Sequence, residues 1–370
     1  MENEVTTLFD YLKWRGDLTL EQDRFNQIDG MILSRFSYLP FELVLEQGEY
    51  MQIAKLEEAL QGVPDITEKV LYQEDLKLLS AMAQSRRFGT LSVGAFVNVF
   101  DEVSESQFSA VSMKLPDGCC LAYRGTDNTL LGWKEDLNMG FIFPYPGQEH
   151  ARAYLESVAA ECAGDLILCG HSKGGNVAMY AAVYASAAVQ DRIRVVYDYD
   201  GPGFRRNVFE EPGYVKMRNR ICTYMPQDSI VGMLLGHLED TMVVHSVGNG
   251  PFQHNVYNWE VQGRDFVHET DVTAASHALD QALTEWFGNM DMTKRELFVE
   301  AAYSLIQETN AKTLGDLRLN LAENSKIVIN SMRNMDEESR KLIGEGMSLF
   351  VKCIIRQRPR RRSGRLLDKN

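Results

Sequence analysis

The stretch from Leu166 to Ala182, LILCGHSKGGNVAMYAA, constrains the fold more than any other part of the chain. A short apolar run precedes a G-x-S-x-G pattern formed by Gly170, Ser172 and Gly174, and a run of small residues follows it. Glycines on both sides of a serine permit a sharp turn between a strand and a closely packed helix. The pattern also arises by chance, but here the flanking runs favour a strand, a tight turn bearing Ser172, and a helix.

The residues around this turn alternate between two patterns. From about 88 to 263, short runs rich in β-branched and aromatic residues are separated by glycine, proline or helical stretches. The predicted strands are TLSVGAFVNVF, FSAVSMKL, CCLAYRG, DLILCG, RVVYDYD, RICTYMP, MVVHSV and VYNWEVQG. Two separators, QEHARAYLESVAAECAG and KGGNVAMYAAVYASAA, have helical patterns. Alternating strands and helices predict an α/β fold with a mostly parallel sheet and crossover helices.

Helical segments flank this core on both sides. We divide the chain into an N-terminal helical extension (1–85), an α/β core (86–265), a C-terminal helical region (266–355) and a basic disordered tail (356–370). In the C-terminal region, apolar residues recur at helical spacing, which predicts faces that pack on a core. These residues are Leu297, Phe298, Ala301, Ala302, Leu305, Ile306, Ile343, Met347, Val351 and Ile355. We expect the two helical regions to cover the sheet or to cap the site.

Charge and cysteine content indicate which partners the protein can bind and in which compartment it lies. The formal net charge is −14, so the body should repel nucleic acid, whereas the segment from 352 to 370 holds eight Lys or Arg residues and one Asp. That tail is a solubilising end, a contact for an anionic membrane surface or, less favoured, a nucleic-acid contact. The absence of a signal-like apolar stretch predicts a cytoplasmic protein. The cysteines lack paired spacing, which predicts free buried thiols at Cys119, Cys120, Cys162, Cys169, Cys222 and Cys353.

A reactive serine needs hydrogen-bond donors around the oxyanion that forms on the substrate. The backbone amide of Lys173, the first residue of the predicted helix, is one candidate. A second lies in CCLAYRGTDNTLLGWKEDL, where a strand runs into Gly125 and Thr126. The amide and the hydroxyl of Thr126 could both donate, although a plain Gly-Thr-Asp turn remains the alternative. The charged side chain of Lys173 could bias the site toward anionic or polar head groups.

Three blocks, YRGTDNTLLGWKEDL, GHSKGG and YMPQDSIVGML, occur in an order that resembles class 3 (fungal-type) lipase-like α/β-hydrolases. The closer resemblance is to a bacterial branch of these proteins, through DYLKWRGDLTLEQDRFNQID, GWKEDLNM, DGPGF and a QH…W block. The resemblance spans about residues 8 to 265. It implies an α/β-hydrolase fold with a lipase-like triad, the nucleophile at Ser172 and the oxyanion threonine at Thr126. It implies no substrate.

Two aspartates compete for the acid of such a triad. Asp228 follows a strand and a proline in RICTYMPQDSIVGML, which is the position that the resemblance favours, and it is our first choice. Asp200, in YDYDGPGF at the end of the preceding strand, is the rival, unless it serves to shape that turn. Asp198 should point to the opposite face from its tyrosine neighbours and is a weaker candidate.

The chain order Ser, Asp, His leaves five histidines as candidate bases: His237, His245, His254, His268 and His277. His254, in GNGPFQHNVYNW, lies in a predicted loop between strands and matches the QH block, so we favour it. His245 lies within a predicted strand, where packing is the simpler role, and His237 is a further alternative. His171 precedes the serine and should point away from its hydroxyl.

Together these residues predict a serine ester hydrolase, similar to lipases and carboxylesterases, that forms an acyl-serine intermediate with Ser172, Asp228 and His254. No cofactor is required, and no metal-ligand spacing is present. A thioesterase or acyltransferase would use the same groups. A non-catalytic lipid-binding or membrane-binding protein on the same scaffold is a second class. The apolar stretch SIVGMLLGHL, at 229–238, is either an acyl pocket or lid, or a buried helix.

Overall fold

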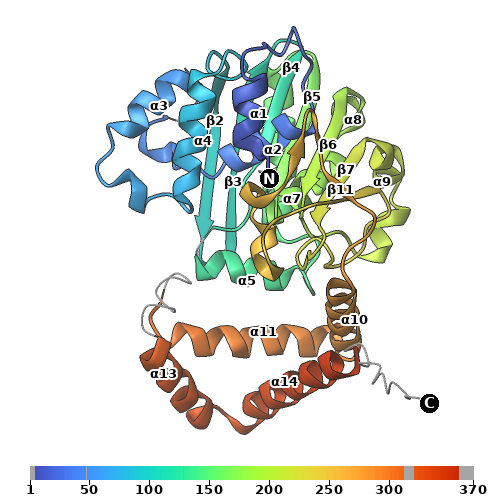
Figure 1. The fold of residues 1–370 in the computed structure, drawn as a ribbon. Helices are drawn as coiled ribbons and strands as arrows, with labels where there is room; N and C mark the ends of the chain where they lie inside the picture. Colours follow the sequence, from blue (N-terminus) through green and yellow to red (C-terminus); the bar gives the residue numbers. More distant parts are fainter. Residues whose placement is uncertain (1–4, 47, 128, 312–320, 358–370) are drawn as a thin grey trace, which may run out of the picture.

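The computed structural model describes residues 5–46, 48–127, 129–311 and 321–357 and has the predicted α/β architecture (Figure 1). One mixed sheet has the strand order β1-β2-β3-β4-β5-β6-β7-β8-β11. Its strands are β1 (Tyr50–Gln52), β2 (Ser92–Asp101), β3 (Ser106–Leu115), β4 (Gly118–Tyr123), β5 (Asp165–His171), β6 (Ile193–Tyr199), β7 (Ile221–Pro226), β8 (Asp240–Val244) and β11 (His268–Glu269). Neighbours from β4 to β8 pair in parallel, and the strands at both edges pair antiparallel.

Most of the predicted strands are present, because each is a short run of β-branched and aromatic residues bounded by turn residues. The exception is VYNWEVQG. Its first part forms a short 3₁₀ turn, η6 (Val256–Asn258), and only β9 (Val261–Gln262) is extended, paired with β10 (Asp265–Phe266). The aromatic residues Tyr257 and Trp259 are buried in the core below the sheet rather than alternating along a strand.

Helices cover both faces of the sheet, so the structure has three layers (Figure 1). One face carries α1 (Leu8–Arg15), α2 (Gln27–Phe36), α3 (Ile53–Gln61) and α4 (Gln73–Gln84). The other carries α6 (Pro146–Glu161), α7 (Lys173–Tyr184), α8 (Ala187–Arg192) and α9 (Pro212–Met217). Side chains of β4 alternate between the two buried apolar clusters, with Cys120 and Ala122 in one and Leu121 and Tyr123 in the other.

The N-terminal helices also bind the segment that follows β8. The backbone amide of Val261 donates to the carbonyl oxygen of Thr6 over 2.9 Å. The Tyr257 hydroxyl donates to a carboxylate oxygen of Asp75 over 2.7 Å, and its ring stacks on Phe9 with centroids 5.6 Å apart. The N-terminal extension therefore packs as part of the core rather than as a separate unit.

The C-terminal helices lie beyond one end of the sheet, below α5 (Leu130–Asn138) in Figure 1. They are α10 (Ala274–Gly288), α11 (Met292–Gln307), α13 (Leu321–Asn334) and α14 (Glu337–Gln357). Lys134 on α5 lies 3.0 Å from the Glu300 carboxylate on α11, and a guanidinium nitrogen of Arg295 donates to the carbonyl oxygen of Gly140 over 3.2 Å. These contacts join the helical region to the core at the edge where β4 to β8 end.

The apolar faces predicted for these helices pack only in part. Ala301, Leu305 and Ile343 are buried together, whereas Met347 and Val351 are about half exposed, at 50% and 49%. Leu297 is also half exposed. The prediction that these positions face a core is therefore wrong for Leu297, Met347 and Val351, because a few helices at one end of a sheet bury little apolar surface. The burial of Ile355 lies outside the described residues.

The structure also corrects the expectation for two of the cysteines. Cys119, in β4, and Cys162, which ends α6, form a disulfide with Cα atoms 6.4 Å apart, so the prediction of free thiols is wrong for this pair. The crossover brings the end of α6 beside the start of β4, a contact that cysteine spacing alone does not reveal. Cys120, Cys169 and Cys222 remain thiols.

The predicted basic tail begins inside a helix, since α14 continues to Gln357. The remaining residues, 358–370, lie outside the described part of the chain, and with them the proposed membrane contact. Within the described ranges, no helix combines the length and the apolar content needed to cross a membrane.

Candidate active site

Ser172 occupies a strained turn between β5 and α7. Its backbone has φ 60° and ψ −135°, in a region that residues with a side chain rarely adopt. The flanking glycines make this turn possible, because a Cβ at Gly170 would lie 2.1 Å from the Gly174 carbonyl oxygen. A Cβ at Gly174 would lie 2.1 Å from the Tyr123 carbonyl oxygen. The predicted strand, turn and helix are present, with Ser172 at the N-terminus of α7.

His254 and Asp200 form a hydrogen-bonded pair beside this turn. The Nδ1 atom of His254, at the end of the 3₁₀ turn η5 (Gly250–His254), lies 2.6 Å from Oδ2 of Asp200. Asp200 is fully buried, and its other oxygen accepts from the Ser229 hydroxyl and, over 3.1 Å, from the Gly232 amide. A carboxylate only accepts hydrogen bonds, so Nδ1 carries the proton in the neutral imidazole, and that tautomer leaves the lone pair on Nε2. A lone pair on Nε2 is what a general base requires.

Backbone contacts bring Ser172 to this pair. The Ser172 amide donates to the carbonyl oxygen of Tyr199 over 2.9 Å, and Tyr199 immediately precedes Asp200. The imidazole of His171, the neighbour of Ser172, lies with its centroid 4.5 Å from that of His254. Because β5 and β6 are adjacent parallel strands, residues at their carboxyl ends meet at one edge of the sheet. Ser172, Asp200 and His254 therefore converge there.

The structure corrects the placement of Asp228. It follows β7, one strand farther from β5, and its carboxylate accepts from the Thr273 hydroxyl over 2.6 Å and from the Gln253 amide over 3.1 Å. It thus binds the turn before His254 and the residue before α10, whereas Asp200 contacts the imidazole. The difference lies in strand order: the residue after the strand next to β5 lies closer to the turn. Asp200, the rival in the sequence, is the carboxylate paired with His254.

The other histidines lie against other carboxylates. Four of them pair through a ring nitrogen, at distances from 2.5 to 3.2 Å: His237 with Glu239, His245 with Glu269, His268 with Asp265, and His277 with Asp271. Among the five candidates, the structure brings His254 to the residues that flank the serine.

His171 supports the loop that carries His254. Its Nε2 lies 2.8 Å from the carbonyl oxygen of His254 and its Nδ1 lies 3.1 Å from the Tyr38 hydroxyl. Since a carbonyl only accepts, Nε2 is the protonated nitrogen and Nδ1 accepts from Tyr38. Burial is the main cause that holds the pKa of His171 well below its usual value, and the neighbouring His254 and Arg35 act in the same direction. A neutral imidazole therefore spans from Tyr38 to the backbone of His254, and no sequence signal identifies Tyr38.

The loop after β4 lies against the serine, as expected for an oxyanion-binding loop. A Cβ built on Gly125 would lie 3.1 Å from the Cβ of Ser172. The Thr126 hydroxyl donates to the Asp136 carboxylate, at 2.6 and 2.7 Å from its two oxygens, so its amide is the group left to face an oxyanion. The amide of Lys173 begins α7 and has no partner within the helix. Asp136 belongs to the GWKEDLNM block, and no pattern in the sequence assigns this aspartate a role.

The charge of Lys173 does not face the site. Its ammonium donates to Glu135 over 2.6 Å and to the carbonyl oxygen of Gln107 over 2.8 Å, and the residue is only 2% exposed. The expectation that this cation selects head groups is therefore wrong. Burial raises the pKa of the nearby Asp136 to about 6, while the charge of Lys173 and the Thr126 hydrogen bond act against that rise.

The segment 229–238 is irregular rather than helical, so the buried-helix alternative is wrong. Ser229 and Gly232 hold the carboxylate of Asp200, and Leu235 and Leu238 are exposed. Within the described ranges, no group of three or more His, Cys, Asp or Glu residues could hold a metal ion.

Comparison with known proteins finds a family match over the part of the chain that contains Ser172, Asp200 and His254. Residues 82–304 match the model of the Mbeg1-like family. Among solved structures, the crystal structure of M37 lipase is similar at 14% sequence identity, over 55% of this chain and 68% of that chain, with a TM-score of 0.35. No curated protein matches the chain.

Proposed function

The chain belongs to the Mbeg1-like family, and from that premise we propose that it is a serine hydrolase that cleaves acyl esters through an acyl-serine intermediate. One observation carries the proposal. Ser172 occupies a strained turn after a central strand, and its amide bonds to the residue before Asp200. The ring of His171, the neighbour of Ser172, lies 4.5 Å from that of His254, whose Nδ1 is 2.6 Å from Asp200. A nucleophile, a base and a group that orients the base are the parts that acyl transfer through serine requires.

In this mechanism, Nε2 of His254 takes the proton of Ser172 as its oxygen attacks the ester carbonyl. Asp200 orients the imidazole and stabilises its cation. The amides of Thr126 and Lys173 bind the oxyanion, a contact whose loss typically costs about 100-fold to 1000-fold in rate. The imidazolium then protonates the leaving alkoxide, and a water molecule, activated by the same His254, releases the acid and restores Ser172.

We further propose an apolar acyl chain. Trp133 and Leu137 on α5, and Leu297 on α11, are half exposed, although α5 and α11 contact each other at the edge where the candidate site lies. Apolar side chains left exposed near a site are typical of surfaces that bind apolar ligands. A thioester or an acyl acceptor other than water would use the same groups, so substrate trials decide between these reactions.

The test is covalent labelling by a fluorophosphonate combined with a panel of 4-nitrophenyl esters of increasing acyl length. We expect labelling and hydrolysis by the wild type, loss of both in Ser172→Ala, and retention in Ser186→Ala, which removes an exposed serine. Circular dichroism confirms that each variant is folded. Labelling that persists in Ser172→Ala, or a folded wild type that neither labels nor hydrolyses any ester, would overturn the proposal and favour the non-catalytic alternative.

A further inference from the structure

Arg124 differs from the other buried cations of the described chain in how its charge is neutralised. Each of the others donates directly to a carboxylate: Arg35 to Asp75, Arg87 to Asp29, Lys134 to Glu105 and Lys173 to Glu135. Arg124 is 8% exposed, yet the carboxylate of Asp127 lies 3.8 Å from its Nη2. Its hydrogen bond over 3.0 Å goes to the neutral side chain of Asn98.

A second nitrogen of the Arg124 guanidinium lacks a hydrogen bond within the described residues. This nitrogen is Nε, and it is buried. Thr129 donates its amide and its hydroxyl to Oδ1 of Asp127, and the oxygen that faces Arg124, Oδ2, stays 3.8 Å from it, beyond hydrogen-bond distance. A buried charge without a direct partner is costly, so an anion that completed this site would gain a strong interaction.

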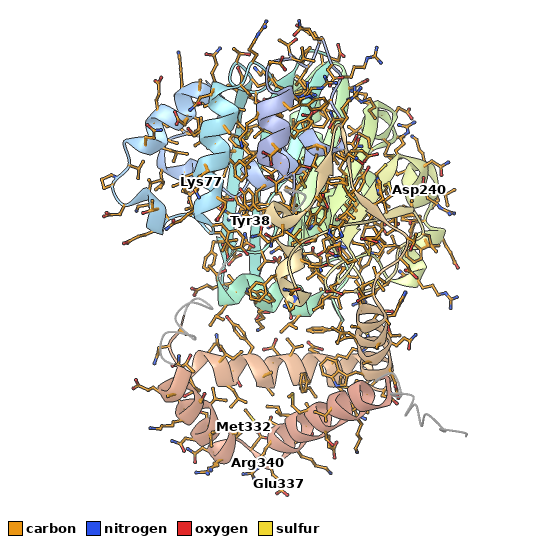
Figure 2. All side chains as sticks on the ribbon, viewed as in Figure 1. Tyr38, Lys77, Asp240, Met332, Glu337 and Arg340 are labelled. Carbon is orange, nitrogen blue, oxygen red and sulfur yellow. A yellow bond between two sulfur atoms is a disulfide. The ribbon has the colours of Figure 1, made fainter. Side chains whose placement is uncertain are left out.

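Arg124 lines a cavity of about 460 Å³ between the N-terminal segment and the sheet edge. Tyr38, Asn98 and Thr129 also form its wall, and the exposed side chains of Glu42, Glu68 and Lys69 stand around it. Figure 2 labels Tyr38, which lies just above α5 in that view. The cavity therefore combines one buried guanidinium, the Asp127 carboxylate 3.8 Å from it, and charges of both signs farther out.

Two residues connect this cavity to the candidate active site: Arg124, whose neighbour in the chain is Gly125, and Tyr38. Gly125, which follows Arg124, lies against Ser172, and a Cβ there would be 2.2 Å from the Tyr38 hydroxyl. The same hydroxyl contacts His171. A ligand group beside Arg124 would thus lie on the loop and beside the tyrosine that support the serine turn.

We propose that this cavity is a subsite for a single anionic group, a carboxylate or a phosphate, carried by the ester substrate. The proposal rests on the proposed function and names the chemistry of its substrate. The planar guanidinium suits the two oxygens of such a group. The acidic side chains Glu42 and Glu68 disfavour more highly charged ligands at the rim, so one anionic group is the best match.

The test compares esters that differ only in one charge. The first pair is 4-(butyryloxy)benzoate and its methyl ester, with the anion on the leaving group. The second is mono-4-nitrophenyl glutarate and its methyl ester, with the anion on the acyl side. We measure the ratio of kcat/KM for the anionic ester to that for the neutral ester. In one pair, this ratio should fall by about tenfold in Arg124→Gln, as expected for a lost hydrogen bond to a charged group.

Asn98→Asp is the sharper variant, because it keeps Arg124. The new carboxylate would lie where an amide oxygen already contacts the guanidinium over 3.0 Å, on an exposed side chain. If Arg124 only supports the fold, this change strengthens its pairing and leaves the ratio unaltered. If Arg124 binds the substrate's anion, the ratio falls about tenfold although the melting temperature is maintained. Arg194→Gln, at the opposite end of β6, should leave the ratio unchanged.

Ratios that stay constant in both Arg124→Gln and Asn98→Asp would overturn the subsite. Failure of the proposed function looks different, since then neither neutral nor anionic esters react and the fluorophosphonate does not label Ser172. In that event, saturation-transfer NMR with 4-hydroxybenzoate and with glutarate decides the question. Binding to the wild type that is lost in both variants supports the anion site, and no binding to the wild type refutes it.

Discussion

Two histidine–carboxylate pairs in this protein have nearly the same local geometry. Nδ1 of His254 lies 2.6 Å from Asp200, and Nδ1 of His237 lies 2.5 Å from Glu239. Their surroundings differ. The His254 side chain is 29% exposed, whereas that of His237 is 10% exposed and its Nε2 is buried without a hydrogen-bond partner in the described chain.

The groups around the two pairs explain their different roles. Glu239 also accepts from the Tyr214 hydroxyl over 2.6 Å and from the Thr223 hydroxyl over 3.0 Å, which makes it a buried polar network. Burial would raise its pKa, but the hydrogen bond and charge of His237 prevail and lower it to about 2. His254 instead lies beside a strained serine. A histidine–carboxylate pair is therefore not a sign of catalysis until a nucleophile lies beside it.

Exchanging each histidine for alanine tests this comparison most directly. His254→Ala should lower kcat/KM for 4-nitrophenyl butyrate by about 10⁴-fold to 10⁶-fold, because the base is lost. His237→Ala should keep activity within about tenfold but lose about 3 kcal/mol of unfolding free energy, because Glu239 stays buried without its cation. Steady-state kinetics and urea unfolding measure the two effects. If activity is lost in His237→Ala and kept in His254→Ala, the catalytic base is His237 rather than His254.

The stability effect of His237→Ala should also depend on pH. The lowered pKa of Glu239 makes its contribution present above its ordinary value of 4.5 and lost as the pH falls toward 2. The pKa of His237 is raised by Glu239 despite burial, so its contribution is present below 6.5 and lost as the pH rises through the raised pKa. The difference in unfolding free energy should therefore be largest between about pH 4.5 and 6.5.

The two aspartates give the next largest contrast. Asp200→Asn should lower kcat by about 10⁴-fold, since an amide cannot stabilise the imidazolium and favours the wrong tautomer of His254. Asp228→Asn should cost less than about tenfold, because its side chain can still accept from Thr273. Equal losses in both variants would mean that the turn at Asp228 controls the position of the imidazole as strongly as Asp200 does.

The ion pair of Lys173 and Glu135 extends the comparison to a buried pair directly after the nucleophile. Lys173→Met should destabilise the fold by about 3 to 5 kcal/mol, because Glu135 is left buried without a cation. The double variant Lys173→Met, Glu135→Leu should recover most of that loss. Urea unfolding of the three proteins measures the recovery, and a double variant as unstable as the single one would show that the hydrogen bonds to Gln107 dominate.

Asp136→Asn should give the smallest effect, and it should be stabilising. Burial raises the pKa of Asp136 from 3.8 to about 6, so its ionisation disfavours the folded state as the pH rises from about 4 to 6. Asn removes that cost and should add about 1 to 3 kcal/mol at pH 8, with the gain vanishing near pH 4. Unfolding in urea at the two pH values checks this. A gain that is independent of pH would rule out ionisation as its cause.

The sequence predicted best what is local. The turn at Ser172 depends on residues that are adjacent in the chain, and the strand and helix around it are read directly. His254 is favoured by its place in a predicted loop and by the QH block of the resemblance, and in the structure its ring lies 4.5 Å from that of His171, the neighbour of the serine. The carboxylate was harder, since choosing Asp200 over Asp228 requires knowing which strand neighbours β5. The disulfide and the incomplete neutralisation of Arg124 depend on contacts between distant segments, which no local pattern encodes.

The attachment of the first helices to the segment after β8 has a consequence for assembly. Thr6, Phe9 and Asp75 contact Val261 and Tyr257, only a few positions beyond His254. Residues made early in synthesis thus need partners made much later: Asp75 and Tyr257 are 182 positions apart, and Thr6 and Val261 are 255 positions apart. A variant that lacks the first helices would keep the strands of the sheet and the turn at Ser172. It would lose the surface against which the segment after His254 packs.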